Sequence, residues 1–373
     1  MESTNDGENN PQTIEMAILD QYILKKFLGT FLFILVLLLG ITIVIDLSEK
    51  LDDFIENQIP VFTIISHYYL NFIPWIISLI GPFFILVSVI FFTSQLAERS
   101  EIIAILNSGT SFRRFLFPYF IGATLLFIVF MFGNHFAVPA ANKGKKEFED
   151  KYINKNEGAL RYSFHRVVRP GMIAYFEYYK PVDHSAQRFS IDFFDGGRLV
   201  HKLMSEKIQW DSIHQRWRVT DYYFRKHIGK NETIERGTVM DTVFPFSPDD
   251  FSFSASEKEV MTTPELTDYI QFMRAGGQPY IEFYEIEKYR RTSSSLSIFL
   301  MTLIGVSVAS RKVRGGLGWH LVLGIGLSAF YEIVMKFSTT FSTNSSLPPF
   351  LGVWIPNFLF MGIALYLYRK APK

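Results

Sequence analysis

The sequence contains no cysteine, so it can form neither a disulfide framework nor a thiolate metal site. It also lacks the G-x-x-x-x-G-K-[ST] loop that cradles nucleotide phosphates and the H-E-x-x-H motif of zinc enzymes. Its eight histidines show no ligand spacing, and no nucleophile and base stand at a recognisable distance. We therefore predict no metal and no cofactor bound by this chain. An enzyme is the least favoured class, although triads of distant residues stay open.

Excess charge of either sign is also missing. The sequence has 37 Lys and Arg against 36 Asp and Glu, a net charge of +1. It has no basic stripe interleaved with aromatic residues, so no nucleic-acid partner is predicted. Apolar residues are plentiful: 49% are hydrophobic and 38 are Phe, yet the mean hydropathy is only +0.16. The apolar residues must therefore be segregated, as in a membrane protein with a sizeable water-exposed part.

Six apolar runs are long enough to cross a bilayer, which takes about 20 residues. They cover residues 27–45, 59–97, 115–142, 292–310, 315–331 and 350–368. The second run is too long for one upright helix, and Pro60, Pro74 and Pro82 indicate a kinked or partly interfacial entry. No small-x-small cleavage site follows the first run, which therefore predicts a retained span rather than a signal peptide.

Lysine and arginine gather on one side of these spans, which predicts cytoplasmic termini. The basic residues of that side are Lys25, Lys26, Arg99, Arg113, Arg114, Arg311, Lys312, Arg314, Arg369, Lys370 and Lys373. The alternate loops, 46–60 and 338–349, are poor in base. The cluster Lys288, Arg290 and Arg291 falls on the outer side, but it follows a large translocated domain, where the bias weakens.

The polar loop between the second and third spans predicts a short helix at about 97–110. Its apolar residues are Ile102, Ile103, Ile105 and Leu106, its charged ones Glu98, Arg99 and Glu101. Gly109 is placed to end the helix. The spacing leaves two interpretations open: docking into a groove of a soluble partner, or an interfacial helix resting on lipid headgroups.

The segment between the third and fourth spans predicts a β domain. Phe189, Ile191 and Phe193 alternate with polar residues and share one face of a strand. The turn Asp195-Gly196-Gly197 precedes a strand over 198–204, and the aromatic-rich segments 171–179 and 217–224 also predict strands. Several short strands at this spacing favour a sandwich or jelly roll of about 100 residues.

Helices are predicted on both sides of this domain. One continues the third span to about Lys151. Another begins near Thr263-Pro264-Glu265, with Thr as its cap and Pro at its first position. Gly276-Gly277 ends it, and a final helix runs from about Gln278 into the fourth span.

Three spans, an outer β domain and three more spans form a rare order, and five segments in that order resemble the LptF/LptG (YjgP/YjgQ) family of lipopolysaccharide-export permeases. They are LDQYILKKFLGTFLF (19–33), SEIIAILNSGTSFRR (100–114), HFAVPAAN (135–142), RKVRGGLG (311–318) and LPPFLGVWIPN (347–357). The resemblance covers nearly everything after the polar tail, and the first segment is closer to LptG than to LptF. The expected protein is an α-helical inner-membrane protein of a Gram-negative bacterium, with six transmembrane helices and an inserted periplasmic β-jelly-roll domain.

The expected domains follow from this organisation. They are a disordered cytoplasmic tail (1–18), the first three spans with the coupling helix at about 97–110 (19–142), the jelly roll with its linker (143–262), and the connecting helices with the last three spans (263–373).

The resemblance implies an ATP-driven exporter that takes lipopolysaccharide from the outer leaflet of the inner membrane. A paralogous LptF-like six-span permease would complete the cavity. A cytoplasmic LptB-like ATPase dimer would use ATP and Mg, and an LptC-like periplasmic protein would receive the lipid. Glu101, with Arg99 beside it, would contact a basic residue of the ATPase, and Ile102, Ile105 and Leu106 would fill its groove.

The resemblance leaves the lipid-binding residues open. Glu332 and Lys336 lie four apart on one helix face, which favours an ion pair. Either Lys336 faces the cavity and attracts lipid phosphates while Glu332 restrains it when empty, or the pair neutralises itself or snorkels outward.

Asp46 stands where the LptG pattern has a lysine, with Glu49 and Lys50 near it at headgroup level. Three explanations stay open: bridging divalent cations, basic residues on the partner permease, or a lipid with fewer phosphates. Phe189, Ile191 and Phe193 would line the roll along which acyl chains travel.

Two other classes remain. A related exporter of another lipid or lipoprotein would keep the coupling helix but change the cavity. A membrane scaffold that does not transport would not need the coupling helix.

Overall fold

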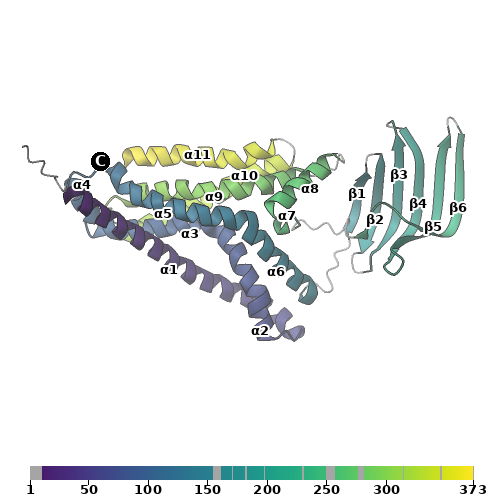
Figure 1. The fold of residues 1–373 in the computed structure, drawn as a ribbon, viewed down its shortest axis with the longest axis horizontal. Coiled ribbons are helices and arrows are strands. Elements are labelled where there is room, and N and C mark those ends of the chain that lie inside the picture. The colour runs from purple at the N-terminus through teal and green to yellow at the C-terminus, as the bar shows by residue number, and fades with distance from the viewer. Residues whose placement is uncertain are drawn as a thin grey trace, which may run out of the picture. The chain divides into compact units, whose positions relative to one another are not determined.

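The computed structural model describes residues 11–153, 161–169, 171–180, 183–196, 198–228, 231–248, 257–275, 281–313, 315–344 and 347–372. The chain divides into two compact units. The first is helical and comprises Met1–Asp52, Val61–Asn142 and Glu285–Lys373, and the second, with the sheet, comprises Asp53–Pro60 and Lys143–Tyr284 (Figure 1).

Six helical stretches of the described residues are long and apolar enough to cross a membrane, which confirms the predicted number of spans. They are Ile18–Glu56, Val61–Glu98, Phe112–Tyr152, Ile281–Ala309, Gly316–Thr343 and Pro349–Lys370. The third stretch comprises α5 (Phe112–Phe132), η2 (Gly133–Ala137) and α6 (Val138–Tyr152), and the last three are α9, α10 and α11. The fifth is longer than its charge-free run because Glu332 and Lys336 continue the helix without breaking it.

The first helix, α1 (Pro11–Glu56), begins inside the region for which the sequence predicted a disordered tail, 1–18. Residues 1–10 lie outside the described part of the chain.

The second span is interrupted by a π-helical turn rather than at the prolines inside it. It consists of α2 (Val61–Thr63), the turn η1 (Ile64–Tyr69) and α3 (Leu70–Glu98), and Pro74 and Pro82 both lie within α3. The third span contains a second such turn, η2. π-Helical turns often mark functional positions. Both turns here bury polar side chains, Tyr68 and Asn134.

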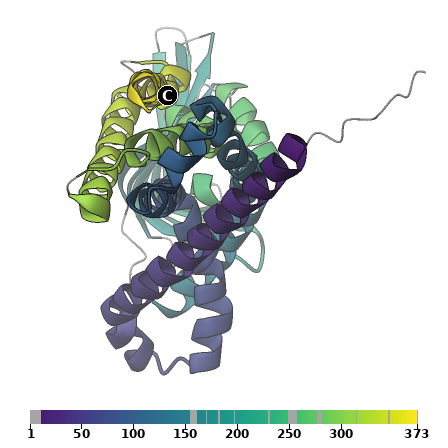
Figure 2. The same cartoon turned by 90° about the vertical axis from the view of Figure 1, so that its left-hand side faces the viewer.

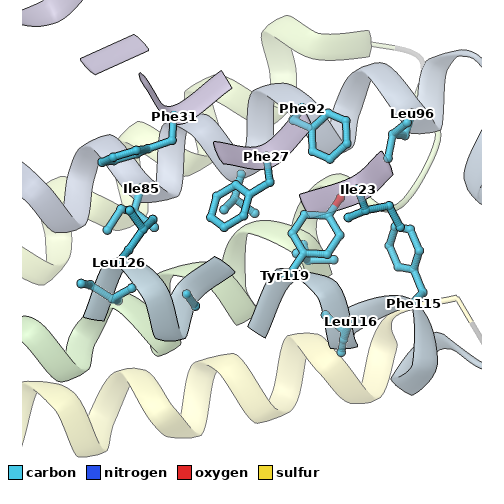
Figure 3. Close-up of a cluster of buried hydrophobic side chains, with 14 of the residues drawn as sticks. Ile23, Phe27, Phe31, Ile85, Phe92, Leu96, Phe115, Leu116, Tyr119 and Leu126 are labelled. Atoms are coloured by element: carbon cyan, nitrogen blue, oxygen red, sulfur yellow. The ribbon is translucent and has the colours of Figure 1, made fainter. Parts of the chain in front are cut away.

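The core of the helical unit is built where α1 meets α3 and α5. Ile23, Phe27 and Phe31 of α1 point toward the other two helices (Figure 3). Their neighbours include Ile85, Phe92 and Leu96 of α3, and Phe115, Leu116, Tyr119 and Leu126 of α5. The most apolar windows of α3 and α9 are 61% and 67% buried, against 11% for α1 and 28% for α10. Figure 2 shows α1 running along the outside of the helical unit.

The described strands form one antiparallel sheet in the order β1-β2-β3-β4-β5-β6. They are Arg161–Arg169, Met172–Lys180, Ser185–Asp195, Arg198–Asp211, Arg216–Ile228 and Asn231–Thr242. The inserted β domain is thereby confirmed, as are the four predicted strands and the turn at Asp195-Gly196, where Gly196 has a φ of +54° and residue 197 is not described. Each strand pairs with its sequence neighbours, so the described strands lack the crossover of a two-sheet roll.

In each pair of neighbouring strands, the residue-to-residue pairing leaves out a position on either strand. These unpaired positions line up as one row across the sheet. The row consists of Ser163, Glu177, Arg188, Glu206, Asp221 and Thr238. Arg188 and Asp221 have φ values of +49° and +50°. On β3, buried Ala186 and buried Phe189 enclose two exposed residues, so the alternation of inward and outward positions changes phase at this row.

Helix α8 (Thr263–Ala275) belongs to the second unit, where Leu266, Ile270 and Met273 pack with Tyr284. Its start agrees with the prediction, except that the cap lies one residue earlier. The backbone N–H of Thr262 donates to Oε2 of Glu265 at 2.8 Å, as in a capping box. The predicted end at Gly276-Gly277 lies outside the described residues.

Candidate functional site

The predicted coupling helix is α4 (Glu101–Asn107), a short helix in the loop between α3, which ends at Glu98, and α5, which begins at Phe112. Ser100, between α3 and α4, has a left-handed backbone with a φ of +63°. Gly109, after α4, has a φ of +88°, which confirms the predicted stop. A left-handed backbone is uncommon for a residue other than glycine, so contacts with neighbouring residues must hold Ser100 in it. Here the Nζ of Lys312 donates to the Oγ of Ser100 at 3.3 Å.

The inward face of α4 corrects the predicted docking surface. Ile102 is 1% exposed and lies in the core shared by α1, α3 and α5, so it is not available to a partner's groove. Ile105 and Leu106 are half-buried against the same core. Ile103, which was not assigned a role, is 49% exposed. Four of the five residues from 102 to 106 are large and apolar, so the sequence does not show which of them packs inward and anchors the helix.

Glu101 is held on α4 by two neighbours. The Tyr22 hydroxyl of α1 donates to Oε2 of Glu101 at 3.2 Å. Nη1 of Arg99 lies 3.9 Å from Oε1, the other carboxylate oxygen. The Glu101 side chain remains 33% exposed, so a partner can still reach it. Tyr22 was missed because nothing in its spacing marks it as a neighbour of residue 101.

A bidentate ion pair fixes the same end of α1 to α5. Nη1 of Arg114 lies 2.7 Å from Oδ1 of Asp20, and Nη2 lies 2.5 Å from Oδ2. The planar guanidinium matches both carboxylate oxygens, which fixes direction as well as distance. Residues 20–22 of α1 are therefore bonded both to α4, through Tyr22, and to α5, through Asp20.

Asp46 and Lys50 bind to each other instead of standing free. Nζ of Lys50 lies 3.7 Å from Oδ1 of Asp46, donates to the Tyr68 hydroxyl, and sits 4.4 Å from the centroid of the Tyr68 ring. The Tyr68 hydroxyl in turn donates to Oδ1 of Asp46 at 3.0 Å. The π-helical turn η1 supplies this tyrosine. Lys50 is thus neutralised within the chain.

Glu332 and Lys336 share a face of α10, but among the described residues no ion pair joins them, contrary to the prediction. Glu332 is half-buried whereas Lys336 is exposed. Three apolar residues in the same part of α10, Ile333, Phe337 and Phe341, are each at least 52% exposed. An exposed ammonium among apolar side chains of a span is costly unless an anion reaches it.

Sequence reasoning missed the role of the basic cluster at 288–291, in which two arginines donate to Glu287. Glu287 is 5% and Arg291 4% exposed. Oε2 of Glu287 accepts from Nη2 of Arg290 at 2.8 Å, and Oε1 from Nε of Arg291 at 3.1 Å. These ion pairs offset part of the positive charge that disagreed with the predicted topology.

A seam of small polar side chains along α9 was also missed. Nδ2 of Asn134 donates to Oγ of Ser295 at 3.1 Å, and its Oδ1 accepts from Ser78 of α3 at 2.7 Å. Asn357 of α11 donates to Ser293 at 2.5 Å and accepts from Tyr331 of α10 at 3.1 Å. The signal in the sequence was the run of hydroxyl residues at 292–295, with a further serine at 297. Such hydrogen bonds join helices inside membranes.

The predicted lining of the β domain lies in its apolar core. Phe189 and Ile191 are 1% and 0% exposed, and Phe193 is half-buried beside them. The Phe189 ring lies against Phe244, which follows β6. Nearby, Nε1 of Trp217 donates to the carbonyl oxygen of Phe246 at 2.9 Å, so this segment covers part of the same face.

Known protein families and proteins show what the whole chain is similar to. A family model described as lipopolysaccharide export system permease LptF/LptG matches residues 21–370. The permease proteins LptG of Escherichia coli strains K12 and O6:H1 are each 21% identical over 372 residues, with 95% of this chain and 98% of the relative covered. An uncharacterised protein of Aquifex aeolicus is 29% identical over 143 residues, 38% of each chain.

Proposed function

The chain belongs to the LptF/LptG family of lipopolysaccharide export permeases, and from that premise we propose that it is one permease half of an ATP-driven exporter. In this proposal it extracts lipopolysaccharide from the outer leaflet of the bacterial inner membrane and passes it to a periplasmic bridge. The E. coli relatives, whose names state that export system, extend over the same length.

The observation that carries the proposal is helix α4. The chain has no P-loop of its own, so the energy would come from an LptB-like ATPase dimer that uses ATP and Mg. Glu101 and the exposed Ile103 offer that partner a carboxylate beside an apolar contact, the combination that fits a groove with a basic rim. Arg99, Ile105 and Leu106 flank this surface, and Ile102 anchors it from within.

The exposed faces of α1 and α10 support a second, LptF-like permease. Both helices leave most of their apolar window unburied. A cavity enclosed by two permeases would give those faces either protein or lipid to contact. Lys336 on α10 is the basic group that would meet a lipid phosphate there. Asp46 and Lys50 neutralise each other, which supports a reduced part for the first span in phosphate capture.

The orientation completes the proposal. Lysine and arginine near the span ends favour cytoplasmic termini and a periplasmic sheet. An LptC-like protein would receive the lipid from the sheet, whose apolar face with Phe189, Ile191 and Phe193 would carry the acyl chains.

The first experiment is mass spectrometry of what co-purifies with the tagged chain from a Gram-negative host in mild detergent. We expect an ATPase, a second six-span permease and lipid A. The ATPase with a different lipid would identify a related exporter of another lipid or lipoprotein. Folded chain without either protein would contradict the transporter and leave the scaffold.

Glu101→Lys gives the matched test. A transporter loses ATPase recovery and lipid release, because the reversed charge repels the basic groove. Asp150→Lys, at an exposed carboxylate of α6 in the other unit, serves as the charge-reversal control. A scaffold tolerates both substitutions.

A further inference from the structure

The Glu101 carboxylate, taken alone, is poorly suited to fix the direction of a docking contact. It sits on a side chain with three rotatable bonds, at the end of a helix of seven residues, and is 33% exposed. A flexible group must lose its rotational freedom when it binds, and that loss is subtracted from affinity. A neighbour that holds the carboxylate beforehand would remove the cost.

Tyr22 is such a neighbour, and it projects from a rigid part of the chain. Its hydroxyl donates to Oε2 of Glu101 at 3.2 Å. The next residue, Ile23, and Phe27 one turn later are 0% exposed in the core with α3 and α5 (Figure 3). The ion pair from Asp20 to Arg114 fixes the turn on its other side. Tyr22 itself is 37% exposed, so its hydroxyl is held in place without being hidden.

Contacts with the helical core and with Lys312 also hold the helix that carries Glu101. Ile102 is buried in the same core, and the left-handed Ser100 accepts a hydrogen bond from Lys312. The backbone of α4 is thereby positioned, and the main freedom left is that of the Glu101 side chain. Tyr22 restrains one carboxylate oxygen, while Arg99 lies 3.9 Å from the other.

We propose that Tyr22 is a positioning residue for the ATPase contact: its hydroxyl holds the Glu101 carboxylate in the direction from which the ATPase binds it. This inference rests on the proposed function, because it assumes that Glu101 meets the ATPase. It adds a residue on the first span, 79 positions away in sequence, to a contact otherwise confined to the loop.

The test is a binding titration of the purified partner ATPase on the full chain, co-expressed with its second permease and held in lipid nanodiscs. Tyr22→Phe removes only the hydroxyl. We expect the apparent Kd to rise about 3- to 10-fold, the cost of ordering one flexible side chain when the ATPase binds. The amount of ATPase bound at saturation stays unchanged, because the phenyl ring preserves the packing.

Tyr366→Phe is the matched control, since Tyr366 is an exposed tyrosine of α11. It is expected to change neither quantity. A structural role of Tyr22 would lower the amount bound at saturation and leave the Kd alone. That result, or an unchanged Kd, overturns the positioning role. A wild-type complex that binds no ATPase at all would instead overturn the proposed function.

Discussion

The two best-buried spans and the two most exposed ones differ in how they use polar residues. α3 and α9 bury 61% and 67% of their apolar windows, and α9 hides a seam of hydroxyl side chains and the Glu287 cluster. α1 and α10 bury only 11% and 28%, and they carry charges at exposed or partly exposed positions, such as Glu49 and Lys336. The Glu287 cluster and the hydroxyl seam of α9 are hydrogen-bonded within the chain, whereas exposed side chains such as Glu49 and Lys336 are left for other molecules.

The difference indicates a division of labour. In lipid, apolar burial does not drive helices together, so packing of small residues and hydrogen bonds must hold the inner spans. The outer spans keep apolar surface and charge for what comes from outside the chain. Substitutions on the inner pair should therefore act on stability, and substitutions on the outer pair on function.

The strongest test of this division is Glu287→Ala. It removes a carboxylate to which both Arg290 and the buried Arg291 donate. Breaking a buried ion pair by removing one partner costs about 3 kcal/mol. We expect a marked fall in thermal stability of the purified chain in detergent. Glu49→Ala on α1 is the control, because that residue is exposed, and an equal loss in both variants would contradict the division.

A glycine of the inner pair provides the second test. A Cβ at Gly305 of α9 would lie 2.7 Å from Cγ1 of Val89 on α3, whereas at Gly40 of α1 nothing lies within 4 Å. Gly305→Leu should cost about 1–3 kcal/mol from overpacking. Gly40→Leu should leave the unfolding temperature nearly unchanged. Equal behaviour of the two variants would show that α3 and α9 do not approach as described.

A reference outside the membrane comes from Glu265 on α8. Hydrogen bonds from Thr262 hold the pKa of this carboxyl below its usual range. Because the folded pKa is the lower one, the stabilisation is present at neutral pH and is lost as the pH falls through that pKa. Glu265→Gln should reduce stability by less than about 1 kcal/mol at pH 7, with the difference from wild type vanishing in acid. A difference that persists in acid would assign it to packing.

Lys336→Met should have the smallest effect on stability, since Lys336 is exposed. We expect no loss of unfolding temperature. Retention of lipid A by the purified complex, measured by mass spectrometry, should fall roughly 10-fold if the ammonium meets a phosphate. Lys370→Met at the end of α11 controls for the loss of a charge. Unchanged retention would remove Lys336 from the proposed site.

Sequence alone predicted the features that rest on local pattern. Long apolar runs specified six spans, alternation at Phe189, Ile191 and Phe193 specified β3, and Gly109 specified the end of α4. Strand β6 was missed because its sequence, NETIERGTVMDT, has no apolar alternation. Its pairing with β5 holds it in place instead.

Sequence could not decide contacts between distant segments. Periodicity identified an apolar surface on α4 but not that Ile102 is the residue turned inward, because that depends on where the core lies. The spacing of Glu332 and Lys336 permitted an ion pair that does not form, and nothing local linked Tyr22 to Glu101. Lys50 binds Tyr68 only because a π-helical turn presents that ring.

The row that every strand pairing skips constrains how this sheet can change over evolutionary time. The inward and outward positions exchange phase there in the strands, from Glu177 on β2 to Asp221 on β5. Deleting one residue from a single strand would turn half of that strand inside out, carrying a side chain such as Phe189 into water. Relatives should accordingly gain or lose residues at this level in all strands together or in none, so gaps in one strand predict gaps in its neighbours.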